Sequence, residues 1–455
     1  MPMPSALEIA RQATLKPVAG IAEDIGIPPW LIEPYGEFVA KIGLGAIEAL
    51  AGRPRARYVV VTAVTPTPLG EGKTTTTIGL GQAADGMPRQ TGFDITAASE
   101  VMAVLALASS LQDMRARLGR IVVGYTPFGE PVTAEQLKAA GAMTVIMRDA
   151  IKPNLLQTLE NTPVLVHAGP FGNIAHGNSS VVADLIGIHS GEFLITEAGF
   201  GADMGAERFF NIRCRVSGLT PDAAVVVTTV RALKAHSGRH RLVAGRPLPA
   251  AMLQENPEEV LLGAANLRKQ LENVRAHGVS PVVAINAMPG DFASEHAVIR
   301  EVADAMGVRS AVCTHFADGG RGAAELAEAV AEAAEEPGEF RFLYPAEAPL
   351  RTKIETIASR LYGADGVDYS AEAARQLDAF ERSGFGGSAW PRPSCRCPRT
   401  RGSRGPRPAG GYRSGRRALR SEPDLSMPSA GRCARCRGWP QIPPPSGSIS
   451  TPTAR

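Results

Sequence analysis

Short apolar runs alternate along most of the chain with stretches in which apolar residues return every three or four positions. The runs predict strands, and the stretches predict helices. The predicted strands are residues 58–64, 121–125, 143–147, 164–167, 192–196, 223–229, 281–286 and 309–314, and the predicted helices are residues 74–82, 94–119, 135–140, 257–276, 322–334 and one that begins at residue 154. Such alternation is typical of an α/β protein with a parallel sheet, whose ligands bind at the carboxyl ends of the strands.

The first of these strands leads into the most distinctive loop of the chain, TPTPLGEGKTTTT at residues 65–77. Gly70 and Gly72 allow backbone N–H groups to converge on an anion. Lys73 adds a positive charge, and Thr74 offers a hydroxyl to Mg²⁺. Residue types and order therefore indicate a phosphate-binding loop.

The loop departs from the general phosphate-loop consensus at one position, because the consensus has glycine where this chain has Thr67. A glycine-rich turn with an incidental lysine is the alternative interpretation. We favour nucleotide binding, because a strand before the loop and a helix start after it are the context that the motif requires. We therefore expect a P-loop NTPase-type parallel sheet with flanking helices, and smaller α/β parts beside it.

Charge and composition divide the chain further. From residue 387 to residue 455 the sequence has 14 Arg, no Lys and two acidic residues, whereas the part before it has an acidic excess. The expected parts are residues 1–50 as a helical segment with a second helix over residues 38–44, residues 51–330 as the nucleotide-binding body, residues 331–386 as the remnant of a C-terminal domain, and residues 387–455 as a disordered Arg/Pro/Gly-rich tail.

Three interpretations of the basic tail are open. Its arginines suit nucleic acid, and Cys395, Cys397, Cys433 and Cys436 suit zinc. We favour the third, a shifted reading frame of GC-rich DNA, because the tail has arginine without lysine, 12 prolines and scattered Cys and Trp. We therefore do not expect a nucleic-acid partner.

The remaining cysteines, Cys214 and Cys313, stand alone in the body, as in proteins of a reducing compartment. No apolar stretch reaches the roughly 20 residues of a membrane helix, and residues 1–10 lack the pattern of a signal sequence. We therefore expect a cytoplasmic protein that does not bind membranes.

Three glycine-containing loops after predicted strands carry further candidates. Glu197, Asp203 and Asp291 are suited to hold Mg²⁺ or a monovalent cation or to orient a substrate amine, although each also fits a turn or a helix cap. The histidines, His176 among them, are too scattered to predict a metal site. No activated nucleophile is evident, which fits phosphoryl transfer from ATP, where positioning and charge neutralisation dominate. The loops are residues 167–178, 197–207 and 286–292.

Taken together, these stretches resemble the formate–tetrahydrofolate ligase family over residues 9–385. Threonine in place of the first glycine of the phosphate loop is also the form seen in that family. The likeness is carried by TPTPLGEGKTTTT, GFDITAASEVMA, LGRIVVGYT, KPNLLQTLENTP, HAGPFGNIAHGNSS, TEAGFGADMGAERFF and LYGADGV, which begin at residues 65, 92, 118, 152, 167, 196 and 361.

The resemblance implies ATP-dependent joining of formate to tetrahydrofolate in one-carbon metabolism. The products would be 10-formyltetrahydrofolate, ADP and phosphate, by way of bound formyl phosphate, with Mg²⁺, a monovalent cation such as K⁺ and a homotetramer. Lys73 would also neutralise the transferring phosphoryl group, Thr74 would contact the metal, and His176, Glu197 and Asp203 would lie on the substrate side. The residues expected at the ATP phosphates are Thr67, Pro68, Leu69, Gly70, Glu71, Gly72, Lys73 and Thr74.

The chain departs from the family in two places. Between Gln82 and Met87 it lacks a long segment, including an Arg-Glu-Pro stretch whose arginine is expected at formyl phosphate. After Gly386 the basic tail stands where the family has further strands and part of its folate site. We therefore expect nucleotide binding but little or no ligase activity. The alternatives are a P-loop ATPase switch and a non-enzymatic nucleotide-binding protein with a basic tail.

Overall fold

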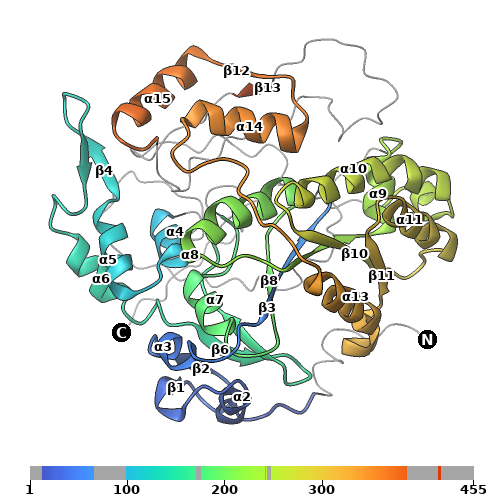
Figure 1. Ribbon diagram of the computed structural model, residues 1–455, viewed down its shortest axis with the longest axis horizontal. Coiled ribbons are helices and arrows are strands. Elements are labelled where there is room, and N and C mark those ends of the chain that lie inside the picture. The colour runs from blue at the N-terminus through green and yellow to red at the C-terminus, as the bar shows by residue number, and fades with distance from the viewer. Residues whose placement is uncertain are drawn as a thin grey trace, which may run out of the picture.

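The computed structural model describes residues 13–65, 99–170, 176–240, 242, 247–386 and 419–421. The phosphate loop from residue 66 onward and the helix expected over residues 74–82 lie outside these ranges, as do the four tail cysteines. The described residues form a five-stranded parallel sheet, a four-stranded antiparallel sheet and helices around them (Figure 1). The expected α/β class, with a parallel sheet flanked by helices, is confirmed.

The parallel sheet has the strand order β11-β10-β9-β3-β8, and all neighbouring pairs are parallel. Its apolar runs predicted all five strands, because a strand covered on both faces is apolar at nearly every position. The edge strand β8 is less covered, since Phe193 is 42% and Ile195 65% exposed. The strands are β3 (Arg57–Ala63), β8 (Phe193–Glu197), β9 (Ala223–Thr228), β10 (Ser280–Asn286) and β11 (Arg309–Cys313).

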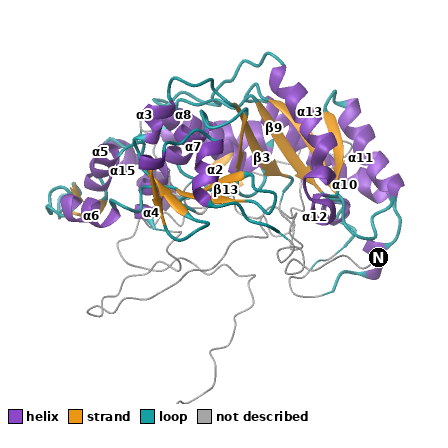
Figure 2. Ribbon diagram, turned by 90° about the horizontal axis from the view of Figure 1, so that it is seen from below, coloured by secondary structure: helices purple, strands orange, loops and turns teal. Residues whose placement is uncertain are grey.

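Helices cover both faces of this sheet (Figure 2). Tyr58 and Val60 of β3 lie in the core shared with α9, α10 and α11, whereas Val59 faces the core shared with α13. The alternation follows from the two-residue period of a strand. These helices are α9 (Val230–His236), α10 (Pro257–Arg275), α11 (Ala293–Ala305) and α13 (Ala324–Glu335). The predicted helices over residues 257–276 and 322–334 are thus confirmed.

Helices α9 and α10 are in direct backbone contact. A Cβ atom on Gly263 of α10 would lie 1.8 Å from the carbonyl oxygen of Leu233 in α9, so no larger residue fits there without displacing a helix. The start of α10 is fixed by Asn256, whose side chain accepts a hydrogen bond from the Glu259 N–H at 3.0 Å, and by Pro257 in the first turn. The two helices therefore form a closely packed pair beside β3 and β9.

The smaller antiparallel sheet corrects two expectations. The helix expected over residues 38–44 is wrong, because Ala40 and Ile42 are buried on one side of strand β2. The helix expected from residue 154 is also wrong, because that segment pairs with β2 and β7. The sheet has the order β1-β2-β6-β7, with β1 (Ile32–Pro34), β2 (Ala40–Ile42), β6 (Asn154–Gln157) and β7 (Pro163–Val166). It shares a core with α2 (Val18–Asp24), α3 (Ala46–Leu50), α4 (Glu100–Leu107), α5 (Leu111–Gly119) and α7 (Val181–Gly187).

The segment between residues 99 and 147 also differs from expectation. The single helix expected over residues 94–119 is divided, because Ser110 leaves the helical conformation and accepts a hydrogen bond from the Asp113 N–H at 3.1 Å. The strand expected over residues 143–147 belongs to a helix, and the helix expected over residues 135–140 is mostly a turn. The elements here are α4 (Glu100–Leu107), α5 (Leu111–Gly119), the hairpin β4 (Val122–Tyr125) and β5 (Pro131–Thr133), and α6 (Ala140–Met147).

The C-terminal described part lies beside the loop that follows β8. Its helix α14 (Leu350–Tyr362) ends at Tyr362, whose hydroxyl donates a hydrogen bond to the carbonyl oxygen of Asp203 at 3.2 Å. The other elements are β12 (Val367–Tyr369), α15 (Ala371–Arg382), β13 (Leu419–Ser421), α8 (Arg215–Ser217), α12 (His315–Asp318), the 3-10 turns η1 (Pro29–Leu31), η5 (Ala250–Leu253) and η6 (Gly319–Ala323), and the π-helical turns η3 (Ala202–Ala206) and η4 (Phe209–Cys214).

Candidate functional site

The described chain enters the phosphate loop at Thr65, two residues after β3. Its N–H donates to Asn266 Oδ1 at 3.1 Å, and its hydroxyl accepts from Asn266 Nδ2 at 2.7 Å and from Gln270 Nε2 at 3.1 Å. The Thr65 carbonyl accepts from His236 Nε2 at 2.8 Å. Burial lowers the pKa of His236, which favours the neutral ring, and because a carbonyl oxygen only accepts, Nε2 is the ring nitrogen that donates here. Three side chains of α9 and α10 therefore hold Thr65.

The loop after β8 packs directly against the end of β3. A Cβ atom on Gly201 would lie 3.2 Å from the carbonyl oxygens of Ala63 and Val64 and 2.6 Å from Asp203 Oδ1. A Cβ atom on Gly205 would lie 1.5 Å from the carbonyl oxygen of Gly199. Gly205 therefore has no room for a side chain, and Gly201 lies tightly against the end of β3, so the loop brings Asp203 next to the strand that leads into the phosphate loop.

The backbone of this loop is unusual in two further respects. Phe200 has φ of 66°, a left-handed conformation that is uncommon for an aromatic residue. Asp203 lies in the π-helical turn η3, and π-turns are frequent at functional sites. Strained residues of this kind cluster where a ligand is bound.

His176 is fully buried near the same edge. Burial, and then the positive charge of Arg213, lower its pKa to about 3. Its Nδ1 lies 3.4 Å from Asn178 Oδ1, and its Nε2 has no hydrogen-bond partner among the residues that the structure describes. The ring is therefore neutral at physiological pH and suited to one further hydrogen bond.

Asn178 joins the His176 loop to β8. Its Nδ2 donates to the carbonyl oxygen of Glu197 at 3.2 Å, and the N–H of Gly199 donates to the carbonyl oxygen of Gly177 at 3.0 Å. Glu197 itself ends β8 with an exposed side chain. The structure thus brings the loops of His176, Glu197 and Asp203 together beside the end of β3.

Asp291 takes a different place. Its Oδ2 accepts a hydrogen bond from the Met288 N–H at 2.9 Å and lies 3.3 Å from His296 Nε2. These contacts close the turn between β10 and α11. Of the two interpretations of Asp291, the turn-forming one fits the structure.

A buried ion pair beneath the loops had no signal in the sequence. Arg213 and Asp184 are 0% and 2% exposed and are bonded to each other, and the Tyr58 hydroxyl also donates to Asp184. Arg213 Nη2 donates to the Ser180 carbonyl at 2.9 Å, and Ser180 caps α7 by accepting from the Ala183 N–H. The Arg213–Asp184 pair therefore fixes the backbone just after His176. In the sequence, only Ser180 gave a hint of this arrangement, as a serine that could cap the helix after it.

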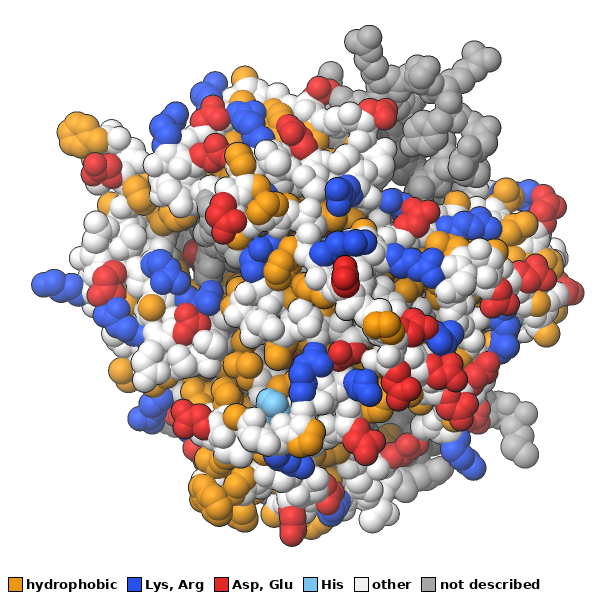
Figure 3. All heavy atoms as spheres, viewed as in Figure 1, with side chains coloured by type: hydrophobic (Ala, Val, Ile, Leu, Met, Phe, Trp, Pro, Cys, Tyr) orange, Lys and Arg blue, Asp and Glu red, His pale blue; other side chains and the backbone are white. Residues whose placement is uncertain are grey.

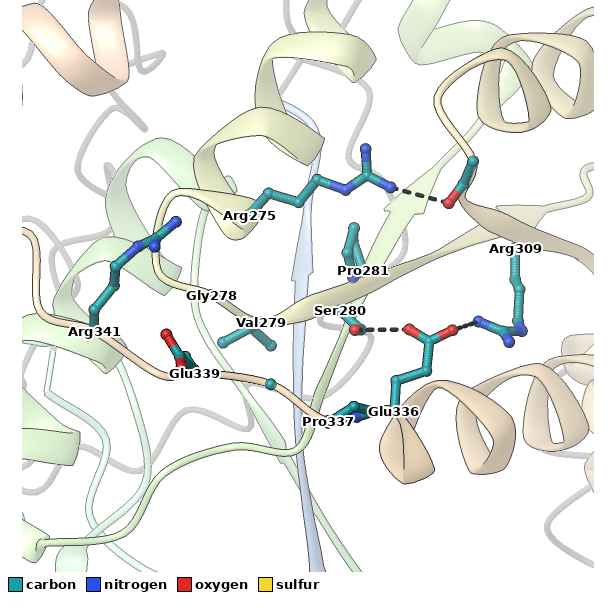
Figure 4. A pocket seen from close by; sticks show the side chains of 12 residues that line it. Arg275, Gly278, Val279, Ser280, Pro281, Arg309, Glu336, Pro337, Glu339 and Arg341 are labelled. Atoms are coloured by element: carbon teal, nitrogen blue, oxygen red, sulfur yellow. Dashed lines mark hydrogen bonds and ion pairs between the residues drawn. The ribbon is translucent and has the colours of Figure 1, made fainter.

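A polar cavity of about 250 Å³ lies at the opposite, amino-terminal edge of the parallel sheet (Figure 4). Arg309 and the Ser280 hydroxyl both bond to Glu336, which lowers the pKa of that carboxyl, and Arg275 donates to the carbonyl oxygen of Gly307. Arginines and glutamates compensate each other here, and the C-terminal end of α10 is unfavourable for an anion. The cavity is separate from the candidate site.

The surface shown in Figure 3 has acidic side chains gathered over α13, whose exposed glutamates include Glu328 and Glu332. An acidic face of this kind does not favour nucleic acid. Within the described ranges no three His, Cys, Asp or Glu side chains are grouped closely enough to hold a metal ion. No helix in the described part of the chain is long and apolar enough to cross a membrane.

Comparison with known proteins adds independent information. The family model "Formate--tetrahydrofolate ligase" matches residues 4–85 and residues 79–389. A formate–tetrahydrofolate ligase of Saccharopolyspora erythraea is 56% identical over 489 aligned positions, which cover 85% of this chain and 86% of the relative. Relatives of the same name from Rubrobacter xylanophilus and Cutibacterium acnes are 51% and 46% identical, each over 84% of this chain and 86% of the relative. With matches of this extent, the chain belongs to the formate–tetrahydrofolate ligase family of enzymes.

Proposed function

We propose that this chain binds ATP with Mg²⁺ at the carboxyl end of β3 and derives from an enzyme that joins formate to tetrahydrofolate. The observation that carries the proposal is the loop GEGKTTTT, which begins five residues after Thr65 in a chain 56% identical to a formate–tetrahydrofolate ligase. The products are 10-formyltetrahydrofolate, ADP and phosphate, and the reaction supplies one-carbon metabolism.

The reaction is proposed to run in two steps. A formate oxygen attacks the γ-phosphorus of ATP, ADP leaves, and formyl phosphate remains bound. The N10 amine of tetrahydrofolate then attacks the formyl carbon, loses its proton, and phosphate leaves. Phosphoryl transfer of this kind needs positioning and charge neutralisation, which residues 67–74 and above all Lys73 are proposed to provide.

The metal ion is expected to be held mainly by the ATP phosphates and the hydroxyl of Thr74, because Mg²⁺ keeps several waters and takes few protein ligands. The buried Thr228 hydroxyl at the end of β9 has no hydrogen-bond partner among the described residues, and it suits a contact with a metal-bound water. When bound, the metal would supply positive charge that offsets the charge of the phosphates. We propose that a monovalent cation such as K⁺ is bound by the carboxylates near the end of β3, those of Glu197 and Asp203.

His176, Glu197 and Asp203 are proposed to face formate, formyl phosphate or the folate. Because His176 is neutral, it is suited to donate or accept a hydrogen bond without adding charge. The loops of Glu197 and Asp203 lie against the end of β3, where the transferred phosphoryl group would be.

Little ligation is expected from this polypeptide, because a stretch of the relatives has no counterpart in it. The family model matches in two overlapping parts that meet at residues 79–85. Moreover, the alignment with the Saccharopolyspora relative has 489 positions, which is more than the 85% of this 455-residue chain that takes part in it. The remaining positions are therefore residues of the relative that this chain lacks. If the missing stretch holds the arginine expected at formyl phosphate, its loss alone lowers the rate by about 10³-fold or more.

The test measures binding and turnover separately with the purified chain. Calorimetry with ATP and Mg²⁺ should show binding that Lys73→Ala weakens, and a coupled assay should show negligible formation of 10-formyltetrahydrofolate beside the Saccharopolyspora ligase as a positive control. Absence of ATP binding would contradict the proposal, and turnover at the rate of the control would contradict the expected inactivity. ATP hydrolysis without formate and folate, stimulated by a macromolecule, would instead support an ATPase switch.

A further inference from the structure

The hydrogen-bond ladder of β3 stops just before the phosphate loop, and side chains take over from there. Within the described ranges, the last ladder contact on the β9 side is the hydrogen bond from the Val64 N–H to the Val227 carbonyl at 3.1 Å. At Thr65 the backbone N–H, the carbonyl and the hydroxyl are all bonded to Asn266, Gln270 or His236. The direction of the chain at Thr65 is therefore determined by side chains of α9 and α10, and no longer by the sheet.

The geometry of the Asn266 contact is reciprocal. One amide accepts from the Thr65 N–H through Oδ1 and donates to the Thr65 hydroxyl through Nδ2. Gln270 lies one helical turn further on the same face of α10 and donates to the same hydroxyl. Two contacts from one planar group fix the orientation of a residue as well as its position.

The helices behind these side chains are closely packed. Asn266 and Gln270 are each only 2% exposed, so neither side chain can turn outward into solvent without disturbing its neighbours. His236 ends α9, and α9 touches α10 through the backbone contact at Gly263. The helix pair and Thr65 are therefore packed together as one unit.

We propose that Asn266, Gln270 and His236 are positioning residues for the nucleotide. By fixing Thr65 they set the direction in which the chain enters residues 67–74, and so they lower the cost of arranging several N–H groups around phosphate. The inference rests on the proposed binding of ATP by that loop. It assigns part of the affinity for ATP to residues about 200 positions away in sequence that touch no phosphate.

Asn266→Ala tests the role against a matched control. Asn273 has the same residue type on the same helix, is 1% exposed, and has side-chain atoms without a hydrogen-bond partner among the described residues. Asn273→Ala should leave nucleotide binding unchanged, because its side chain does not contact Thr65. Asn266→Ala should weaken binding of ATP with Mg²⁺ about 10-fold, because the Thr65 N–H loses its partner and the Thr65 hydroxyl keeps only the bond from Gln270. Calorimetry gives the affinities, and thermal unfolding gives the stabilities.

Thr65 itself offers a second pair of variants. Thr65→Val keeps the shape and the backbone contacts but removes the hydroxyl, so the affinity for ATP should fall by about 3- to 10-fold. Thr65→Ser restores the hydroxyl and should bind almost as the unchanged protein does. Amide hydrogen exchange without nucleotide should show faster exchange at the end of β3 in Asn266→Ala and not in Asn273→Ala.

The outcomes separate the inference from the proposed function. If the unchanged protein binds ATP but Asn266→Ala and Asn273→Ala weaken it equally, the positioning role is wrong and ATP binding stands. If the unchanged protein binds no ATP, the proposed function is wrong and so is the assignment of affinity to the helix pair. Weaker binding in Asn266→Ala and Thr65→Val alone, with faster exchange at Thr65, supports the inference.

Discussion

At the scale of single residues, burial determines the charge of two histidines. Burial lowers the pKa of His176 to about 3 and that of His277 to about 4, from an ordinary value of 6.5. His277 is held by hydrogen bonds with the Asn273 carbonyl and with Asn211 Nδ2, so it is tied into the structure as a neutral ring. Both histidines favour the folded state only while they carry no proton.

The pH dependence of stability follows with a definite sign. Below pH 6.5 these two histidines take up protons in the unfolded chain but not in the folded chain. The free energy of unfolding therefore falls as the pH falls from 6.5 towards 4. Each histidine contributes a slope of up to about 1.4 kcal/mol per pH unit. Urea unfolding between pH 4.5 and 7 measures it, and His176→Gln should reduce the slope. His189→Gln, at a surface histidine, is the control, and an equal reduction there would contradict the prediction.

At the scale of elements, strands buried on both faces were predictable and short half-buried strands were not. Val59 and Val60 are both buried in β3, so the run could only be a buried element. Ala40-Lys41-Ile42 fits a strand and a helix equally, and pairing with β1 and β6 decided in favour of a strand. Ser110 could have signalled the division of the 94–119 helix, but its apolar flanks concealed the cap.

The candidate site was predictable only where it follows strands. The loops of Glu197 and Asp203 were expected at the sheet edge because β8 was recognised. Asn266 and His236 gave no signal, because a polar residue inside a helix pattern reveals its contact only when the distant Thr65 is placed beside it. Tertiary contacts of this length are invisible to periodicity.

The contact between α9 and α10 gives a prediction for elements. Gly263→Ala should destabilise the protein by about 2 kcal/mol or more, because the new methyl group would overlap the Leu233 carbonyl and separate the helices. Gly141→Ala, inside α6 with nothing within 4 Å of the new methyl group, should instead stabilise by up to about 1 kcal/mol. Chemical denaturation compares the two, and similar effects for both substitutions would argue against the close helix contact.

At the scale of the whole molecule, the parallel sheet, as far as the structure describes it, has an open side. Among the described strands β8 has a neighbour only in β3, and Phe193 and Ile195 expose apolar surface there. An exposed apolar edge strand promotes pairing with other chains. The molecule is therefore expected to associate as its concentration rises.

Ile195→Thr should weaken this association several-fold while it keeps a β-branched residue in the strand. Sedimentation velocity over a range of concentrations measures the effect. Val123→Thr in the β4 hairpin, at a residue 45% exposed, is the matched control and should leave association unchanged. If Ile195→Thr associates like the unchanged protein, β8 is not the contact.

The hydrogen bond from Tyr362 to the Asp203 carbonyl joins α14 to the loop after β8. If the docked α14 strengthens the binding of a ligand on that loop, the bound ligand must stabilise the docked α14 by the same free energy, because coupling between two sites is reciprocal. A bound substrate would thus act as a clamp on the C-terminal part, and resistance of α14 to proteolysis would become a reporter of occupancy at a loop more than 150 residues away along the chain.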